Sequence, residues 1–453
     1  MTPADSAEAL ASLEFAAVLE VIAARAARPQ AAERLRHATP TTDIATITTE
    51  LGRTAELLAL WRRAERLDIP PVPDLRAALA RLRVEGSVLE LGELVDVRRT
   101  LAAGRIIAAE LVRVAESCPT VALLRAEPVD RAIERDLERA VSDEGELLDT
   151  ASPALAAARR EVHAARERLV KRLEAIARDQ GGGAVTMREG RYVIPVRRDA
   201  RDRPDGIIHD ESGSAGTLFI EPTAAIPLGN ALRAAVIAEE REVLAVLRAL
   251  TEGLRPARDA IAALHGMAVT LDTLQARAGW AFDCEAECPE VTGERGALVL
   301  HHARHPLLLA RGIDVVPFDL RLDEGERTLL ISGPNTGGKT VLLKAVGLVL
   351  LLAQSGIIPP VGAGSRLPVI ARLFVDIGDH QSLQADLSTF SAHVAELRRI
   401  LAGADERTLV ILDEIGSGTD PAEGGALAMA VLEELTRRGA LTLATTHLGS
   451  LKT

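Results

Sequence analysis

Residues 329–353 read LLISGPNTGGKTVLLKAVGLVLLLA, and this stretch decides the fold of the C-terminal part of the chain. Its apolar start predicts a buried strand, its glycines predict a tight loop, and the apolar run after Lys339 predicts a helix. The spacing from Gly333 to Lys339 and Thr340 matches G-x-x-x-x-G-K-[ST], in which backbone N–H groups and a helix N-terminus surround phosphates. The lysine of that pattern reaches the terminal phosphates, and the hydroxyl binds Mg²⁺. The predicted nucleotide-binding residues are Gly333, Pro334, Asn335, Thr336, Gly337, Gly338, Lys339 and Thr340.

Two later apolar runs also end in polar residues. Leu409–Leu412 is followed by Asp413 and Glu414, and a run that starts at Leu441 is followed by His447. The carboxyl ends of parallel strands meet at one edge of a sheet, where such sheets bind ligands. We therefore expect Asp413 to complete a magnesium site with Thr340, and Glu414 to orient the attacking water. Lys339, Glu414 and His447 are the predicted catalytic residues of an ATP site, with His447 near the γ-phosphate.

Composition limits the class of protein. A chain of 453 residues with 47% hydrophobic and 26% charged residues predicts a folded protein of about two to four domains. The N-terminus carries acidic residues where a signal peptide is basic, and no apolar run reaches membrane-spanning length. We therefore expect a cytoplasmic protein without a membrane partner.

The charged and aromatic residues limit the expected binding to nucleic acid, and the cysteines limit the expected disulfides and metal sites. A net charge of −12 excludes uniform coating of nucleic acid, and 2% aromatic residues leave few rings for base stacking. Cys118, Cys284 and Cys288 do not suggest a disulfide framework. Cys284 and Cys288 precede three histidines, but their spacing is unusual for zinc, so a metal site there is a minor alternative.

Heptad spacing predicts a long helical pair in the middle of the chain. Leu155, Val162, Leu169 and Ile176 lie seven residues apart, and the run starting at Val236 repeats this interval. Three β-like runs separate the two helices: Arg191–Val196, Gly206–His209 and Thr217–Ile220. The pattern indicates two antiparallel lever helices with a small β insert at their tip. The predicted ranges are 1–150 for a helical core, 151–180 and 229–290 for the levers, 181–228 for the insert and 291–453 for the ATPase domain.

The predicted arm contains a local surplus of basic residues. Between Leu155 and Pro204 there are thirteen Arg and Lys against seven Asp and Glu. Such a surplus at the tip of an arm is a plausible contact for a phosphate backbone, although it is also typical of a solvated face. Its centre is predicted at Arg188, Arg191, Arg197, Arg198, Arg201 and Arg203.

The C-terminal part has further strand and helix signals. Short strands are expected at Leu298–Leu300, Val315–Leu320 and Leu373–Val375, and Gly362–Pro368 is expected to be a linker. The segment DLSTFSAH, residues 386–393, predicts a turn followed by a capped helix, since Ser388 or Thr389 can cap that helix. This helix lies between the phosphate loop and the Asp413 strand, where one large class of ATPases places its signature helix.

The motifs resemble those of a known family. GPNTGGKT, DLSTFSAH, LVILDEIGSGTDP and ATTH, in this order, resemble the ATPase domain of MutS proteins within the ABC superclass. The segments LEFAAVLEVIAARA, ELLDTASPALAAARRE, GRYVIPVRRD and GIIHDESGSAGTLFIEP are similar to the second bacterial type, the endonuclease MutS type. The implied fold is multidomain: an α-helical core and coiled-coil-like lever arms with a small β insert, followed by an α/β ABC-type P-loop ATPase domain.

The resemblance implies a function. It implies ATP and Mg²⁺ as cofactors, with Ser388 acting across a homodimer interface and Asp420 near the subunit junction. It implies a clamp on branched or double-stranded DNA in the control of homologous recombination. An alternative is binding of ribosomal RNA on stalled or collided ribosomes. A transporter subunit is disfavoured because DLSTFSAH replaces the LSGGQ-type signature.

Two departures from the family pattern limit these expectations. The chain begins directly in helical core, so mismatch reading is not expected. It ends at Thr453, before the dimerising segment and C-terminal Smr nuclease domain that the resemblance implies. We therefore interpret it as an N-terminal fragment, monomeric where the full-length protein is a homodimer, with endonuclease activity only in a longer parent.

Overall fold

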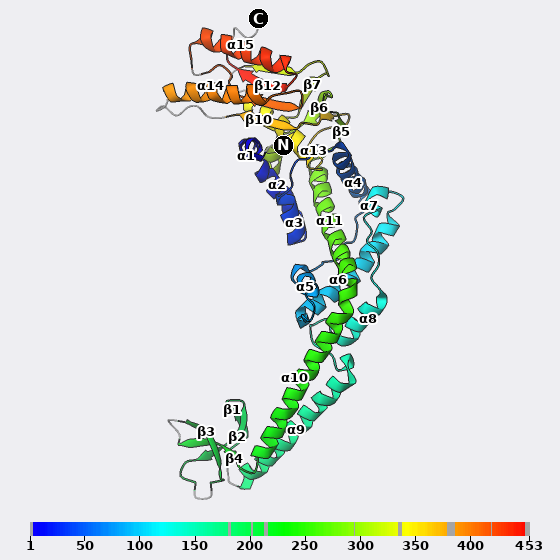
Figure 1. Cartoon of the computed structure of the whole chain (residues 1–453), viewed down its shortest axis with the longest axis vertical. Coiled ribbons are helices and arrows are strands. Elements are labelled where there is room, and N and C mark those ends of the chain that lie inside the picture. The colour runs from blue at the N-terminus through cyan, green and yellow to red at the C-terminus, as the bar shows by residue number, and fades with distance from the viewer. Residues whose placement is uncertain are drawn as a thin grey trace. The chain divides into compact units, whose positions relative to one another are not determined.

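A computed structural model of the chain describes eight stretches of residues (Figure 1). These are residues 3–179, 183–200, 203–212, 216–293, 295–333, 338–377, 386–417 and 419–448. Two compact units result: residues 1–71, 105–126 and 266–453 form the first, and residues 72–104 and 127–265 form the second. In the described part of the chain, no helix has both the length and the apolar composition needed to span a bilayer.

The central element of the first unit is a parallel sheet with the strand order β10-β11-β12-β8. Its strands are β8 (Thr328–Ser332), β10 (Arg372–Asp376), β11 (Thr408–Leu412) and β12 (Leu441–Thr446). All of β11 and β12 is buried, as expected for strands covered on both faces. The strands predicted before Gly333, at residues 373–375, at residues 409–412 and from Leu441 onward are confirmed.

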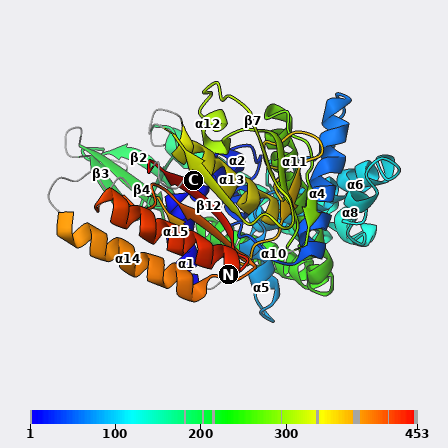
Figure 2. The ribbon, with the colours of Figure 1, turned by 90° about the horizontal axis from the view of Figure 1, so that it is seen from above.

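The two faces of this sheet carry different helices. Leu409 and Ile411 belong to the same apolar cluster as α13 (Lys339–Gln354), while Val410 and Leu412 belong to a second cluster. That second cluster contains residues of α14 (Asp386–Gly403) and α15 (Pro421–Arg437), which lie side by side (Figure 2). Alternate side chains of a strand point to opposite faces, so β11 connects both layers. The helix predicted after the glycine loop is confirmed, and it begins at Lys339.

A second sheet of the first unit has the order β5-β9-β6-β7. Its strands are β5 (Glu290–Thr292), β6 (Leu298–Ala303), β7 (Phe318–Leu322) and β9 (Arg366–Pro368). The predicted strand Val315–Leu320 is therefore wrong at both ends, because β7 begins at Phe318 and ends at Leu322. The predicted linker Gly362–Pro368 is wrong in its last three residues, because β9 pairs with β5 and contacts β6. Pairing with strands more than sixty residues earlier determines β9, and local composition does not encode it.

N-terminal helices complete the core of the first unit. They are α1 (Pro3–Ser12), α2 (Phe15–Ala23), α3 (Pro29–Arg36), α4 (Ile44–Arg62) and α7 (Pro119–Ala122), with α12 (Pro306–Ala310) farther along the chain. The fully buried residues Leu13, Val18 and Ile22 share one apolar cluster with α13 and the parallel sheet. Two long helices, α6 (Leu91–Arg113) and α11 (Arg258–Asp283), contain residues of both units.

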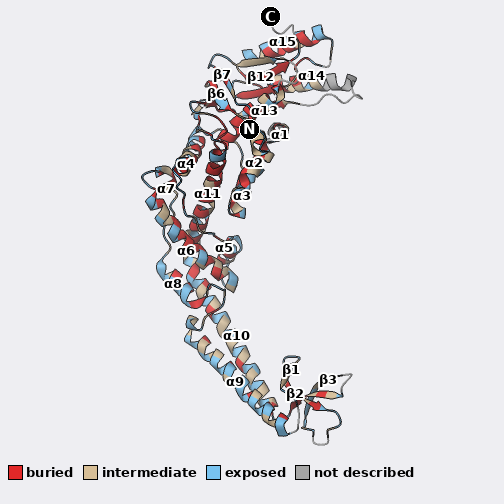
Figure 3. Ribbon diagram, turned by 180° about the vertical axis from the view of Figure 1, so that it is seen from behind, coloured by how far each residue is buried: buried red, intermediate tan, exposed pale blue. Residues whose placement is uncertain are grey.

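The second unit contains the predicted helical pair. Its helices are α5 (Arg76–Leu82), α8 (Arg131–Ala140), α9 (Pro153–Asp179) and α10 (Ile226–Leu254), with the short 3-10 turns Asp149–Ala151 and Arg255–Ala257. Leu155, Val162 and Leu169 of the predicted α9 stripe are buried, and Ile176 is half-buried. Three further α9 residues are buried, and most of the remaining positions are exposed (Figure 3): the buried ones are Ala165, Leu173 and Ala177. Val162 packs with Ala235 of α10, and Arg159 forms an ion pair with Glu239 at 3.3 Å. The predicted packing of the two helices is confirmed.

An antiparallel sheet with the order β1-β2-β4-β3 lies between α9 and α10 in the chain. Its strands are β1 (Thr186–Arg188), β2 (Arg191–Arg197), β3 (Gly206–Ser212) and β4 (Thr217–Pro222). The three predicted runs correspond to β2, β3 and β4, and β1 was missed because it is only three residues long. The apolar face of the sheet, including Ile194 and Ile220, packs on Leu169 and Leu173 of α9.

The charge of this insert differs from the prediction. Residues 183–228 contain six arginines against seven Asp and Glu, so the predicted surplus belongs to α9 and not to the insert. Four of the six arginines have carboxylate partners within 3.2 Å: Arg188–Asp210, Arg191–Glu221, Arg197–Asp199 and Arg198–Glu211. Arg203 is exposed, and Arg201 lies outside the described residues. These partners offset the charge that was predicted to attract a phosphate backbone.

We expect His305 to make the first unit sensitive to acid. Burial lowers its pKa to about 4, assisted by the nearby Lys344, and its Nδ1 accepts the N–H of Leu308 at the start of α12. The unfolded chain, with a His pKa of about 6.5, binds this proton more readily below pH 6.5. Stability is therefore present above pH 6.5 and is lost as the pH falls toward 4. Between pH 7.5 and 5, the wild type should lose about 2 kcal/mol more unfolding free energy than His305→Asn.

Urea unfolding at the two pH values measures this difference. Asparagine keeps an acceptor at the helix N-cap but does not titrate. Equal losses in the two proteins would contradict the assignment to His305.

Candidate nucleotide site

Lys339 occupies the first position of α13. The preceding residue, Gly338, has a φ of 71°, a left-handed conformation that glycine adopts without steric cost. The Lys339 side chain is buried, and its Nζ donates a hydrogen bond to the carbonyl oxygen of Gly333 at 2.5 Å. Nζ also lies 3.1 Å from Nε2 of His447. The predicted loop residues Pro334, Asn335, Thr336 and Gly337 lie outside the described residues.

Asp413 lies between two threonine hydroxyls. Thr340 Oγ1 donates to Asp413 Oδ2 at 2.5 Å, and the Thr445 hydroxyl donates to Asp413 Oδ1. The backbone N–H of Asp413 donates to the carbonyl oxygen of Asp376, at the end of β10, at 2.8 Å. The carboxylate is thus held by β12 and by the first turn of α13, and the backbone of Asp413 is held by the end of β10.

Glu414 follows in an uncommon backbone conformation. Its φ is 54°, in the left-handed region that non-glycine residues seldom occupy and that recurs at functional sites. Its N–H donates to Thr445 Oγ1 at 2.8 Å, and its Oε1 lies 3.4 Å from Nε2 of His447. The next turn is also constrained, since a Cβ on Gly424 would lie 2.2 Å from the carbonyl oxygen of Gly416.

These side chains have the chemistry that Mg²⁺ and a triphosphate require. Thr340 and Asp413 bring a hydroxyl and a carboxylate together, and Mg²⁺ prefers such oxygen ligands. Lys339 supplies a buried ammonium beside the helix N-terminus, a position that favours phosphate. The residues present therefore fit both groups, with Thr340 and Asp413 as the metal ligands and Lys339 as the phosphate ligand.

Two predicted residues are not placed in this group. Asp420 caps α15 and accepts the N–H groups of Ala422 and Glu423 at 2.9 and 3.4 Å. The backbone of Ser388 lies in the first turn of α14, and its side chain lies outside the described residues.

Sequence reasoning missed Thr445 as a site residue. Its hydroxyl bonds both to the Asp413 carboxylate and to the Glu414 N–H. The available signal was a threonine near the end of the strand, two positions before His447. The minor zinc alternative gains no support, because the described residues contain no group of three or more His, Cys, Asp or Glu that could hold a metal. Burial also raises the pKa of the Cys284 thiol to about 12.

Comparisons with known proteins agree with this geometry. Residues 329–453, which contain the P-loop, Asp413 and Glu414, match the family model of MutS domain V. The chain is 48% identical to an endonuclease MutS2 of Gemmatimonas aurantiaca over 99% of its length. The chain belongs to the MutS family. This MutS-family chain is also 40% identical to an endonuclease MutS2 of Symbiobacterium thermophilum over 98% of its length, and 41% identical to that of Thermomicrobium roseum over 99%.

The chain spans 56 to 58% of the length of these three relatives. Their shared name places the chain with the second bacterial type of MutS protein, as its sequence motifs predict.

Proposed function

We propose that this MutS-family chain is a clamp ATPase, in which ATP binding and hydrolysis control the grip on nucleic acid. The observation that supports this proposal is the convergence of Lys339, Asp413, Glu414 and His447, from the ends of three strands, at one edge of a parallel sheet. This edge is where open α/β sheets bind ligands. Calorimetric titration with Mg²⁺-ATP tests the proposal directly, and folded protein without affinity would refute it.

The roles of the residues follow from their positions. The Lys339 Nζ would exchange the carbonyl of Gly333 for phosphate oxygens, and Thr340 and Asp413 would hold the metal ion. When bound, Mg²⁺ neutralises charge that develops on the phosphates. Glu414 would orient the attacking water and accept its proton, and His447, beside both Lys339 and Glu414, would contact the γ-phosphate.

We further propose that closure requires two copies of the ATPase domain. Ser388 would contact the nucleotide bound by the partner copy, and Asp420 would lie near the junction, as the family resemblance implies. A homodimer is thus the working state. Gel filtration with and without a non-hydrolysable ATP analogue tests whether this chain dimerises or stays monomeric.

The proposed function also includes a nucleic-acid target. We propose that the target is branched or double-stranded DNA and that the process is the control of homologous recombination, not mismatch reading. The proposed place of action is the cytoplasm. The alternative target is ribosomal RNA on collided ribosomes, and both present phosphate backbones. Affinity for a four-way DNA junction compared with affinity for collided ribosomes separates the two. The relatives named above are called endonucleases.

Lys339→Ala should weaken Mg²⁺-ATP binding about 10- to 100-fold, because a buried charge-assisted hydrogen bond contributes about 1.5–3 kcal/mol. Calorimetry measures the dissociation constant. Lys344→Ala is the matched control, since Lys344 lies on the same helix but pairs with Glu14 at 3.0 Å. If both variants bound like the wild type, Lys339 would not be a phosphate ligand.

A further inference from the structure

A pocket lies in the second unit, which contains none of the residues assigned to ATP. It is a cleft of about 300 Å³ between the β1–β2 hairpin and one side of α9 and α10. Gly229, Leu232, Arg233 and Val236 line it at helical spacing from α10, and Arg166 lines it from α9. This volume is at the lower end of the range typical of small-ligand sites, roughly 300–1,000 Å³.

The floor of the cleft contains a buried ion pair. The Glu221 side chain is only 4% exposed, and its two oxygens lie 3.2 Å from Arg191 Nη1 and 2.8 Å from His209 Nε2. Gly229 leaves room for this group, since a Cβ there would lie 3.0 Å from Glu221 Oε1. The floor is therefore ordered without a ligand, and Glu221 balances the charge of Arg191.

The rim of the cleft retains positive charge. Arg166 and Arg233 are exposed, and neither has an ion pair with any residue that the structure describes. Glu189 is the remaining carboxylate of the lining. With Arg191 and Glu221 balancing each other, two guanidinium groups stand against one carboxylate. The excess of one positive charge complements the single negative charge of one phosphodiester.

One wall of the cleft is aromatic. Tyr192 is the only tyrosine of the chain, and it lies directly opposite Met187 in the register of β1 and β2. Directly opposed residues of an antiparallel pair place their side chains on the same face, and both of these line the cleft. Met187 is 51% exposed, and the Tyr192 ring is half-buried. A nucleobase can stack on such a surface, because base–aromatic stacking tolerates any base.

We propose that this cleft binds one nucleotide of a single-stranded nucleic-acid segment. The base packs on Tyr192 and Met187, and the phosphodiester lies between Arg166 and Arg233. The inference rests on the proposed function only in taking nucleic acid as the partner, and it adds a specific contact for an unpaired strand. It is compatible with the expectation that few rings are available for base stacking, because it uses only the single tyrosine of the chain.

The single tyrosine permits a site-specific test. Incorporation of fluorotyrosine gives the full chain one ¹⁹F resonance, at position 192. Single-stranded five-nucleotide DNA and RNA should each be titrated, with inorganic phosphate and a blunt DNA duplex as the other two probes. We expect a saturable shift of the resonance with at least one of the single strands. No shift with either strand, or an equal shift with phosphate alone, would overturn the proposal.

Variants distinguish binding in the cleft from general electrostatic attraction of the oligonucleotide to the protein. Arg166→Ala and Arg233→Ala should each weaken the oligonucleotide titration at least about 5-fold, as expected for loss of a charge-assisted contact. Arg160→Ala is the matched control, because Arg160 is another exposed arginine of α9 that does not line the cleft. Equal weakening by all three variants would refute a discrete site. The resonance of each variant without ligand reports whether the hairpin is folded.

Failure of this inference can be distinguished from failure of the proposed function. The same samples are assayed for ATP turnover and for binding of a DNA junction. Junction binding without a ¹⁹F shift would refute the cleft alone. A ¹⁹F shift in protein that does not hydrolyse ATP would leave the cleft intact and refute the ATPase proposal.

Discussion

Glu414→Gln should bind Mg²⁺-ATP and slow its hydrolysis about 10²- to 10⁴-fold, the range that general-base catalysis contributes. Glutamine has nearly the same shape as glutamate, so the backbone at φ 54° and the N–H bond to Thr445 can persist. Its amide cannot accept a proton from water. Single-turnover release of phosphate measures the chemical step, and calorimetry measures binding.

The control for this variant is Glu433→Gln. Glu433 is an exposed carboxylate on α15, so the same change of charge there should leave the rate unchanged. If the proposed closure occurs, Glu414→Gln should also accumulate ATP-bound dimers in gel filtration. Turnover at the wild-type rate would show that Glu414 is not the general base.

The site was predictable from sequence because its chemistry is local. Gly333, Lys339 and Thr340 lie within eight consecutive residues, and their spacing determines which groups can face a phosphate. Asp413 and His447 follow strands whose apolar character is evident, and a parallel sheet brings their ends to one edge. Thr445 was not predicted, because its role depends on a neighbouring strand that lies more than thirty residues earlier.

Contacts between segments that lie far apart in the sequence explain why the other features were predicted wrongly or missed. β9 is only three residues long, and its partners are β5 and β6. The partners of Arg188 and Arg198, which are Asp210 and Glu211, are brought close by the insert sheet and not by sequence proximity. Likewise, the apolar residues of α1 and α2 predict helices but do not indicate that these helices share a core with the C-terminal sheet. The five predicted domain ranges stay a prediction.

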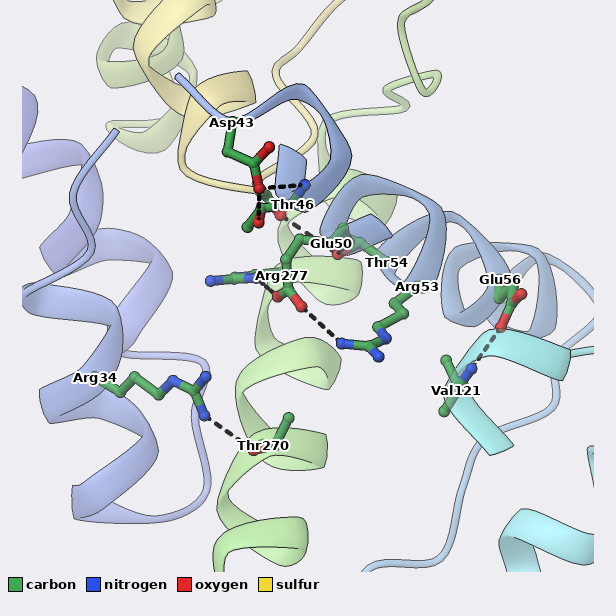
Figure 4. Close-up of polar contacts among 11 residues, drawn as sticks. Arg34, Asp43, Thr46, Glu50, Arg53, Thr54, Glu56, Val121, Thr270 and Arg277 are labelled. Carbon is green, nitrogen blue, oxygen red and sulfur yellow. Dashed lines mark hydrogen bonds and ion pairs between the residues drawn. The ribbon is translucent and has the colours of Figure 1, made fainter. Parts of the chain in front are cut away.

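An ion pair with a buried guanidinium joins α4 and α11 (Figure 4). Glu50 Oε2 lies 2.7 Å from Arg277 Nη1, and Glu50 Oε1 lies 2.9 Å from Arg53 Nη1. The Arg277 side chain is 9% exposed, and burial lowers its pKa while Glu50 raises it. The turn after α13 packs on the same pair, since a Cβ on Gly356 would lie 2.6 Å from the Glu50 Cβ.

Glu50→Gln should therefore reduce the free energy of unfolding by about 3–5 kcal/mol, the cost of leaving a buried charge without its partner. Urea unfolding at pH 7 measures this loss. Glu56→Gln is the matched control: it lies on the same helix, and its carboxylate accepts the N–H groups of Thr120 and Val121 at 3.1 and 3.0 Å. Because a glutamine oxygen can still accept, we expect a loss of about 1 kcal/mol there.

The double variant Glu50→Gln, Arg277→Met distinguishes a buried charge from a general loss of packing. Removing both charges should restore most of the lost stability, because a buried ion pair replaced by apolar groups of similar volume is often neutral. If the loss of stability in the double variant equalled the sum of the losses in Glu50→Gln and in Arg277→Met, the cost of Glu50→Gln would not come from the unpaired guanidinium. If Glu50→Gln cost no more than Glu56→Gln, the pair between α4 and α11 would be incidental to the fold.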